Sequence, residues 1–208
     1  DYGWSGHKRI VDLGEGPGRL LAAILEANES VTGVVWKQEA LLASAKAWWM
    51  RLSERVRNRV EFASGGAFEE LGGLRAGDAL LLGCELSTKD EETATEALLG
   101  LRRSIGARDV TLLVADLVLD ERETDRVKLT MDAQVRGLGP IHHRTRGGWA
   151  ALLLAGGFQL DQIVECRGRT WLIEASGVRG FLLDHEAVDA EPESPPSLAE
   201  PARTTNAA

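Results

Sequence analysis

The chain has 208 residues, enough for one domain with a sizeable core. Apolar residues make up 44% and charged residues 27%, which is typical of a soluble globular protein. The net charge of −8 and the lack of a concentrated basic segment argue against nucleic acid as a partner. No apolar run reaches membrane-spanning length and no signal peptide is visible, so we expect no membrane partner.

Strand-like and helix-like segments alternate along the chain. In chain order we expect a strand over Lys8–Leu13, a helix over Pro17–Asn28, a strand over Val31–Trp36, a helix over Glu39–Arg57, and short strands over Val60–Ala63 and Ala79–Leu82. Further on we expect a helix over Asp90–Ser104, a strand over Val110–Val118, helices over Asp125–Val135 and Trp149–Ala155, and an antiparallel pair over Phe158–Glu165 and Thr170–Ala175. This order predicts a mostly parallel sheet with helices on both faces and a ligand at the carboxyl ends of the strands.

Residues 184–208 are rich in acidic residues, proline and alanine, and they cannot bury enough apolar surface to fold. We therefore expect one domain over residues 1–183, followed by a disordered acidic tail. The two cysteines, Cys84 and Cys166, lie in apolar strand-like runs without metal-ligand spacing. This usage indicates a reduced, cytoplasmic protein and no metal site.

The most informative segment joins the first strand to the first helix and reads Asp12-Leu13-Gly14-Glu15-Gly16-Pro17-Gly18. Glycines let the backbone turn sharply and approach a ligand closely. The free N–H groups and the dipole of the following helix favour polar or anionic groups. The segment therefore predicts a ligand site at the end of the first strand.

This glycine pattern resembles motif I of the class I S-adenosylmethionine (SAM) methyltransferases. Further matches resemble the catalytic domain of the small-molecule O-methyltransferases of the bacterial polyketide and hydroxyneurosporene types and the plant caffeate type: Trp4-Ser5-Gly6, Arg59–Phe62, Asp78–Leu82, Leu112–Val114, Arg144-Thr145 and Trp149–Phe158. The resemblance implies an α/β, Rossmann-like class I methyltransferase fold with a seven-stranded, mostly parallel sheet and a terminal antiparallel hairpin. It also implies SAM as cofactor and a small-molecule substrate.

Four positions depart from the pattern that the resemblance implies. Lys37 stands where the family has an acid that accepts both ribose hydroxyls, and lysine offers only donors. Gly66 stands where an Asp lies near the adenine end. Ser87 stands at the position of the general-base histidine, and His143 replaces the Glu that orients that base. Serine has no useful basicity at neutral pH, so the expected base is missing from its usual position.

These observations give two sets of candidate site residues. The cofactor candidates are Asp12, Gly14, Gly16, Gly18, Trp36, Lys37 and Gly66. The catalytic candidates are His143, His142, Ser87 and Asp116, with either histidine a possible relocated base. Each candidate also has a purely structural alternative. The glycines could form a βα turn without a ligand, Trp36 could pack in the core, and the two histidines could be solvated or cap a helix.

Loss of four functional positions together indicates relaxed or changed selection for methyl transfer. The favoured hypothesis is a divergent member that acts on or binds a small aromatic or polyketide-like molecule, with methyl transfer impaired or repurposed. Three alternatives stay open: an active SAM-dependent O-methyltransferase, a nicotinamide-dependent oxidoreductase, and a non-catalytic domain that pairs with an active homologue. The oxidoreductase pattern requires a third glycine where Arg19 stands, although Lys37 would suit a 2′-phosphate.

The chain starts at Asp1 without a methionine. Members of the resembled family usually carry an N-terminal helical dimerisation domain. We therefore expect that an upstream domain is missing and that it could mediate a homodimer.

Overall fold

A computed structural model describes residues 2–66, 68, 71–119, 141–166 and 170–181. The helix expected over Asp125–Val135, the turn at residues 167–169 and the tail over residues 184–208 lie outside these ranges. Within the described part of the chain, no helix is long and apolar enough to cross a membrane.

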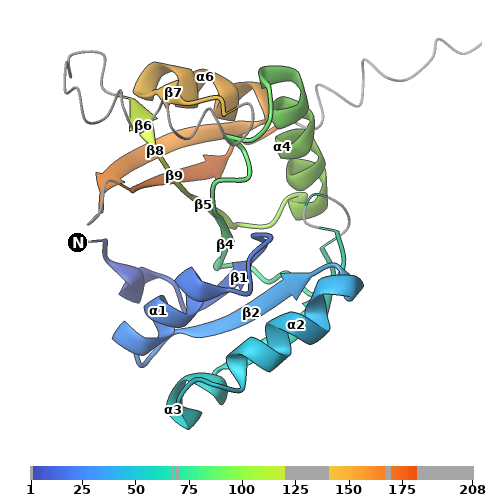
Figure 1. Ribbon diagram of the computed structural model, residues 1–208. Coiled ribbons are helices and arrows are strands. Elements are labelled where there is room, and N and C mark those ends of the chain that lie inside the picture. Colours follow the sequence, from blue (N-terminus) through green and yellow to red (C-terminus); the bar gives the residue numbers. More distant parts are fainter. Residues whose placement is uncertain (1, 67, 69–70, 120–140, 167–169, 182–208) are drawn as a thin grey trace, which may run out of the picture.

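The described strands form a seven-stranded sheet in the order β3-β2-β1-β4-β5-β9-β8 (Figure 1). Its strands are β1 (Arg9–Asp12), β2 (Thr32–Lys37), β3 (Val60–Ser64), β4 (Asp78–Leu82), β5 (Thr111–Asp116), β8 (Phe158–Glu165) and β9 (Trp171–Gly177). Neighbouring strands from β3 to β5 run parallel, whereas β9 runs antiparallel to both β5 and β8. The expected mostly parallel sheet with a terminal antiparallel pair is confirmed.

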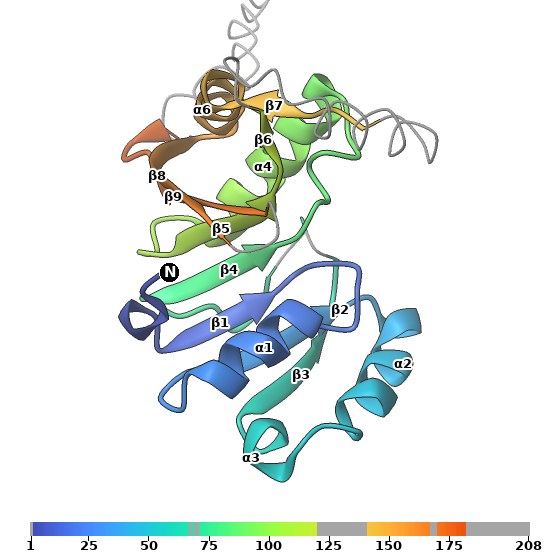
Figure 2. The same ribbon diagram turned by 60° about the vertical axis from the view of Figure 1, so that its left-hand side comes forward.

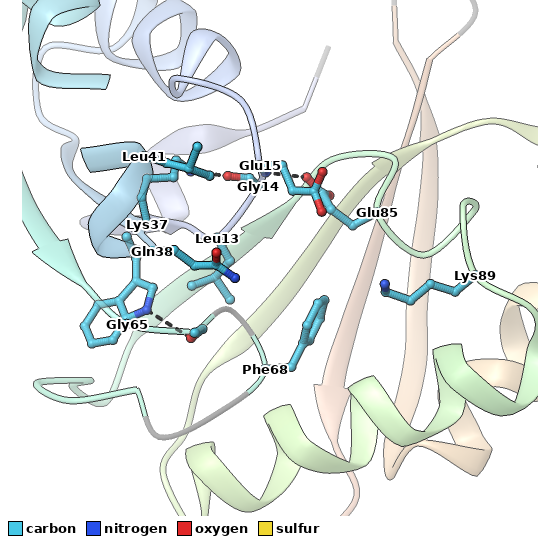
Figure 3. Close-up of a pocket in the computed structure, with 12 residues that line it drawn as sticks. Leu13, Gly14, Glu15, Lys37, Gln38, Leu41, Gly65, Phe68, Glu85 and Lys89 are labelled. Carbon is cyan, nitrogen blue, oxygen red and sulfur yellow. Dashed lines mark hydrogen bonds between the residues drawn. The ribbon is translucent and has the colours of Figure 1, made fainter. Parts of the chain in front are cut away.

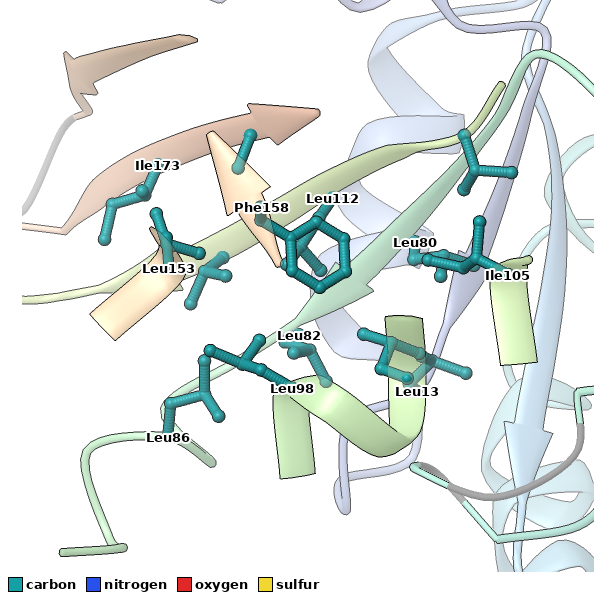
Figure 4. Close-up of a cluster of buried hydrophobic side chains, with 14 of the residues drawn as sticks. Leu13, Leu80, Leu82, Leu86, Leu98, Ile105, Leu112, Leu153, Phe158 and Ile173 are labelled. Atoms are coloured by element: carbon teal, nitrogen blue, oxygen red, sulfur yellow. The ribbon is translucent and has the colours of Figure 1, made fainter. Parts of the chain in front are cut away.

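Helices cover both faces of this sheet because adjacent apolar residues on the central strands point to opposite sides. Ile10 and Leu81 pack in a cluster with α1 (Arg19–Ala27), α2 (Glu39–Trp49) and α3 (Glu54–Arg57). The second cluster lies on the other face, where Leu80, Leu82 and Leu112 pack against α4 (Glu91–Ile105) and α6 (Arg146–Ala155). Figure 4 shows this second cluster, in which Leu98 of α4 and Phe158 of β8 meet the central strands.

Three elements differ from the sequence expectation. The single helix expected over Glu39–Arg57 is divided into α2 and α3, and Arg57 donates to the Met50 carbonyl in the break at 3.1 Å. The strand expected over Val110–Val118 ends at Asp116, whose carboxylate accepts the N–H of Leu117 at 2.7 Å. The chain then forms β6 (Val118–Leu119), which pairs in parallel with β7 (Arg144–Thr145) as a separate small sheet.

Two helix starts and one short element also differ. Helix α1 begins at Arg19 rather than Pro17 because Gly18 has φ = 92°, a left-handed conformation that a helix interior excludes. Helix α6 begins at Arg146 rather than Trp149 because the Thr145 side chain caps it by accepting the N–H of Gly148. A short 3-10 helix over Trp4–Gly6 was not expected.

Candidate functional site

A cleft of about 290 Å³ lies at the carboxyl ends of β1, β2 and β4. Figure 2 shows these three strands side by side in the sheet. Its lining comes from the glycine turn, the end of β2, the loop after β3 and the connection from β4 to α4 (Figure 3). The lining residues are Leu13, Gly14, Glu15, Trp36, Lys37, Gln38, Leu41, Gly65, Gly66, Phe68, Glu85 and Lys89. This is the place that a parallel α/β sheet offers to a ligand.

The glycine turn is held by Asp12, which is 6% exposed. Its Oδ1 accepts the N–H of Gly14 at 2.9 Å, so the carboxylate fixes the first residue of the turn. A Cβ on Gly14 would lie 2.8 Å from Oε1 of Glu85, at the edge of the cleft. Gly18 lies at the N-cap of α1, and Gly16 is exposed and not part of the cleft lining. Of the three candidate glycines, Gly14 is therefore the one that lines the described cleft.

Lys37 is buried at the end of β2, and its ammonium is bonded to the glycine turn where that turn lines the cleft. Its Nζ lies 3.3 Å from the Asp12 carbonyl and 3.4 Å from Asp12 Oδ1, and it also donates to the Gly14 carbonyl. Burial raises the pKa of Asp12, and the Lys37 charge opposes that rise. A buried ammonium thus compensates the buried carboxylate, and Lys37 offers no acceptor to a ligand hydroxyl.

Trp36 forms one wall of the cleft without filling it. The indole is 8% exposed, and its Nε1 donates to the Gly66 carbonyl at 3.1 Å. A Cβ on Gly65 would clash with the indole at 2.4 Å, so this glycine allows the ring to lie flat against the loop. Gly66 thereby contributes its backbone to the cleft wall, at the position where the resembled family has an Asp.

Glu85 lines the cleft and was not among the candidate residues from the sequence. Its Oε1 accepts the N–H of Glu15 at 2.9 Å, which joins the β4–α4 connection to the glycine turn (Figure 3). Its Oε2 is buried and has no hydrogen-bond partner among the described residues. No signal in the sequence indicates this contact, because the two residues are 70 positions apart.

The catalytic candidates gather on the neighbouring side of β4 and β5. Asp116 is 1% exposed, and its Oδ2 accepts a hydrogen bond from Ser87 Oγ at 2.5 Å. Burial raises the pKa of Asp116, and the bonds from Ser87 and Leu117 and the charges of His143 and Arg144 oppose the rise. His142 is exposed, and its N–H donates to the Ser87 carbonyl at 2.7 Å. Ser87, Asp116 and His143 therefore form one polar group.

Arg144 holds this polar group in place. Its guanidinium donates to the carbonyls of Leu86 at 3.0 Å and Lys89 at 3.2 Å, which are both in the β4–α4 connection. It also pairs with Glu91 at 2.8 Å and lies over the Trp149 ring, 5.4 Å from its centroid. The planar guanidinium thus ties the connection that carries Glu85, Ser87 and Lys89 to the start of α6.

The described residues of this region offer no activated thiol and no cluster of metal ligands. Burial and the nearby carboxylates of Asp116 and Glu85 raise the pKa of Cys84 to about 11, so the thiol is a poor nucleophile at neutral pH. No group of three or more His, Cys, Asp or Glu side chains that could hold a metal ion occurs among the described residues.

The O-methyltransferase domain family matches residues 1–159. The chain belongs to this family. The O-methyltransferase-family domain is 32% identical over 170 residues to the 8-amino-8-demethylriboflavin N,N-dimethyltransferase of Streptomyces davaonensis, with 77% of this chain and 47% of that protein covered. It is 30% identical over 175 residues to the phenazine O-methyltransferase PhzM of Lysobacter antibioticus, with 84% of this chain and 50% of that protein covered.

Among solved structures, the domain resembles the O-methyltransferase NcsB1 from neocarzinostatin biosynthesis, with a TM-score of 0.68 and 20% identity. The match covers 85% of this chain and 51% of NcsB1, whose structure is a complex with S-adenosylmethionine and 2-hydroxy-5-methyl naphthoic acid. At this identity the likeness confirms the class I methyltransferase fold. The O-methyltransferase-family domain spans about half the length of the curated relatives it matches.

Proposed function

We propose that this chain is a divergent small-molecule methyltransferase domain that holds SAM weakly in the glycine cleft, and that its methyl transfer is impaired or repurposed. The observation that carries the proposal is the buried Lys37 ammonium, bonded to the glycine turn at the end of β2. The proposed substrate is a small aromatic or polyketide-like molecule, because the relatives act on riboflavin-like and phenazine molecules.

The cleft retains several features that suit SAM. The turn is fixed by Asp12, Gly14 leaves room beside the cleft, and Trp36 and Phe68 supply apolar lining. The end of β2 departs from this fit because Lys37 cannot accept ribose hydroxyl hydrogens. When bound, SAM supplies an electrophilic methyl group on a sulfonium, and the chain's task is to position an acceptor against it.

The acceptor side supports impairment for a separate reason. Ser87 is 2% exposed, and its hydroxyl is engaged with Asp116, so it supplies no base to a substrate hydroxyl. Asp116 is buried with a raised pKa, and it is hydrogen-bonded on both oxygens. Ser87 and Asp116 therefore stabilise the β4–α4 connection through their mutual hydrogen bond.

A titration of the full chain with SAM and S-adenosylhomocysteine tests the proposal, with Gly14→Ala and Gly16→Ala as a matched pair. We expect a Kd of about 100 µM or weaker, because Lys37 cannot accept the ribose hydroxyl hydrogens. Each loss of about 1.4 kcal/mol of contact energy weakens binding about tenfold. The Gly14→Ala methyl group enters the cleft beside Glu85 and should abolish binding, whereas a Cβ on Gly16 meets nothing within 4 Å and should leave it unchanged.

Two results of this titration would contradict the proposal. Low-micromolar binding that depends on Gly14, together with rapid transfer of labelled methyl groups to phenolic acceptors, would show that the site is not impaired. Absence of saturable binding by the unmodified chain would show that the cleft no longer holds SAM.

A second candidate function, an active O-methyltransferase, is favoured by the group formed by Ser87, Asp116 and His143. Asp116 interacts with the charge of His143, which stands on the segment leading into β7. An imidazole beside a carboxylate can serve as a general base. On this candidate, His143→Ala lowers methyl transfer about 100-fold, within the range for general bases, whereas the exposed His142→Ala leaves it unchanged. Equal rates for both variants would exclude it.

A further inference from the structure

The cleft has two chemically different ends. At the β2 end, the Lys37 ammonium is taken up by the glycine turn, so this end presents neutral groups such as Gln38 and the Trp36 wall. At the β4 end, Glu85 and Lys89 line the same cleft from the β4–α4 connection, and Lys89 points into it (Figure 3). A ligand with one charged end and one neutral end is therefore oriented by charge.

The state of the Glu85 carboxylate indicates what that charged end is. One oxygen already accepts the N–H of Glu15 at 2.9 Å. The other is buried and has no hydrogen-bond partner within the described part of the chain. A buried carboxylate oxygen without a donor is costly, and a cationic ligand group within reach removes that cost.

We propose that Glu85 and Lys89 recognise the zwitterionic amino-acid end of SAM, with the ammonium on Glu85 and the carboxylate on Lys89. This inference rests on the proposed function, because it places SAM in the cleft. The β4–α4 connection then orients the bound SAM, with its adenosine toward β2 and its amino-acid end toward β4. Arg144 keeps that connection in place through the carbonyls of Leu86 and Lys89.

The test compares two neutral-sulfur ligands that differ only at the amino-acid end. S-adenosylhomocysteine carries the ammonium and the carboxylate, whereas 5′-methylthioadenosine has neither. Binding of each to the full chain is followed by NMR titration in the unmodified protein, Glu85→Gln, Lys89→Gln and Glu92→Gln. Glutamine at residue 85 keeps an acceptor for the Glu15 N–H and changes only the charge and the second oxygen. Glu92 is an exposed carboxylate on α4 outside the cleft and serves as the matched control.

We expect the unmodified chain to bind S-adenosylhomocysteine about tenfold or more tightly than 5′-methylthioadenosine, because hydrogen bonds between charged groups are stronger than those between neutral groups. Glu85→Gln and Lys89→Gln should each lower this preference by about tenfold through weaker S-adenosylhomocysteine binding, while Glu92→Gln keeps it. An unchanged preference in folded Glu85→Gln would overturn the inference and leave SAM binding intact. Failure of the unmodified chain to bind either ligand would instead overturn the proposed function.

Discussion

Replacing Lys37 by methionine is expected to lower the free energy of unfolding by about 3 kcal/mol, because it leaves a buried carboxylate without its cation. Lys37 is 3% exposed and Asp12 6% exposed, so water cannot replace the lost ammonium. Urea denaturation followed by circular dichroism measures the change. The double variant Asp12→Asn, Lys37→Met is the control, because it removes both charges and keeps an acceptor for the Gly14 N–H.

The same substitution has a defined dependence on pH. Burial already raises the pKa of Asp12 in the folded protein, and Lys37 opposes that rise, so its loss raises the pKa further. A raised pKa means that the folded state favours the protonated carboxyl, and stability falls as rising pH ionises it. The cost of Lys37→Met should therefore be larger at pH 8 than at pH 5. A cost that does not shrink at low pH, or that persists in the double variant, would mean that Lys37 acts through packing alone.

Replacing Arg144 by methionine should lower the free energy of unfolding by about 3 kcal/mol, because the carbonyls of Leu86 and Lys89 lose their hydrogen bonds from the guanidinium. Urea denaturation again gives the free energy. Arg144→Lys should recover only part of it, since one ammonium cannot reproduce the planar fork. Glu91→Gln should cost less than about 1 kcal/mol, because the Glu91 side chain is 63% exposed and its pairing is screened by water. A Glu91→Gln variant as unstable as Arg144→Met would show that the ion pair matters more than the carbonyl contacts.

The sequence predicted the sheet and most of its helices because their signals are local. The apolar runs at β1 and β4 and the terminal hairpin follow from periodicity alone, and the structure confirms them. The break between α2 and α3 and the small sheet of β6 and β7 were missed. The first depends on a contact from Arg57 to the Met50 carbonyl, and the second on pairing between segments more than 20 residues apart. The pairing of β6 with β7 leaves no pattern in neighbouring residues.

The candidate site likewise has features that the sequence predicted and features that it did not. The glycine turn and the replacement at Lys37 could be identified from spacing, but the direction in which the Lys37 ammonium points could not. Glu85 was not among the candidate residues from the sequence. Its role in the cleft depends on the side-by-side placement of β1 and β4, which brings the connection after Leu82 against the glycine turn.

The position of Trp36 gives the cleft an intrinsic optical reporter. Of the six tryptophans in the chain, it is the one that lines the described cleft, and its indole N–H is bonded to the Gly66 carbonyl on the cleft wall. Trp49 donates to the Pro17 carbonyl of the glycine turn at 2.7 Å but does not line the cleft. Occupancy of the cleft can therefore be followed by the fluorescence of the unlabelled chain, and a Trp36→Phe variant identifies the part of the signal that belongs to the site.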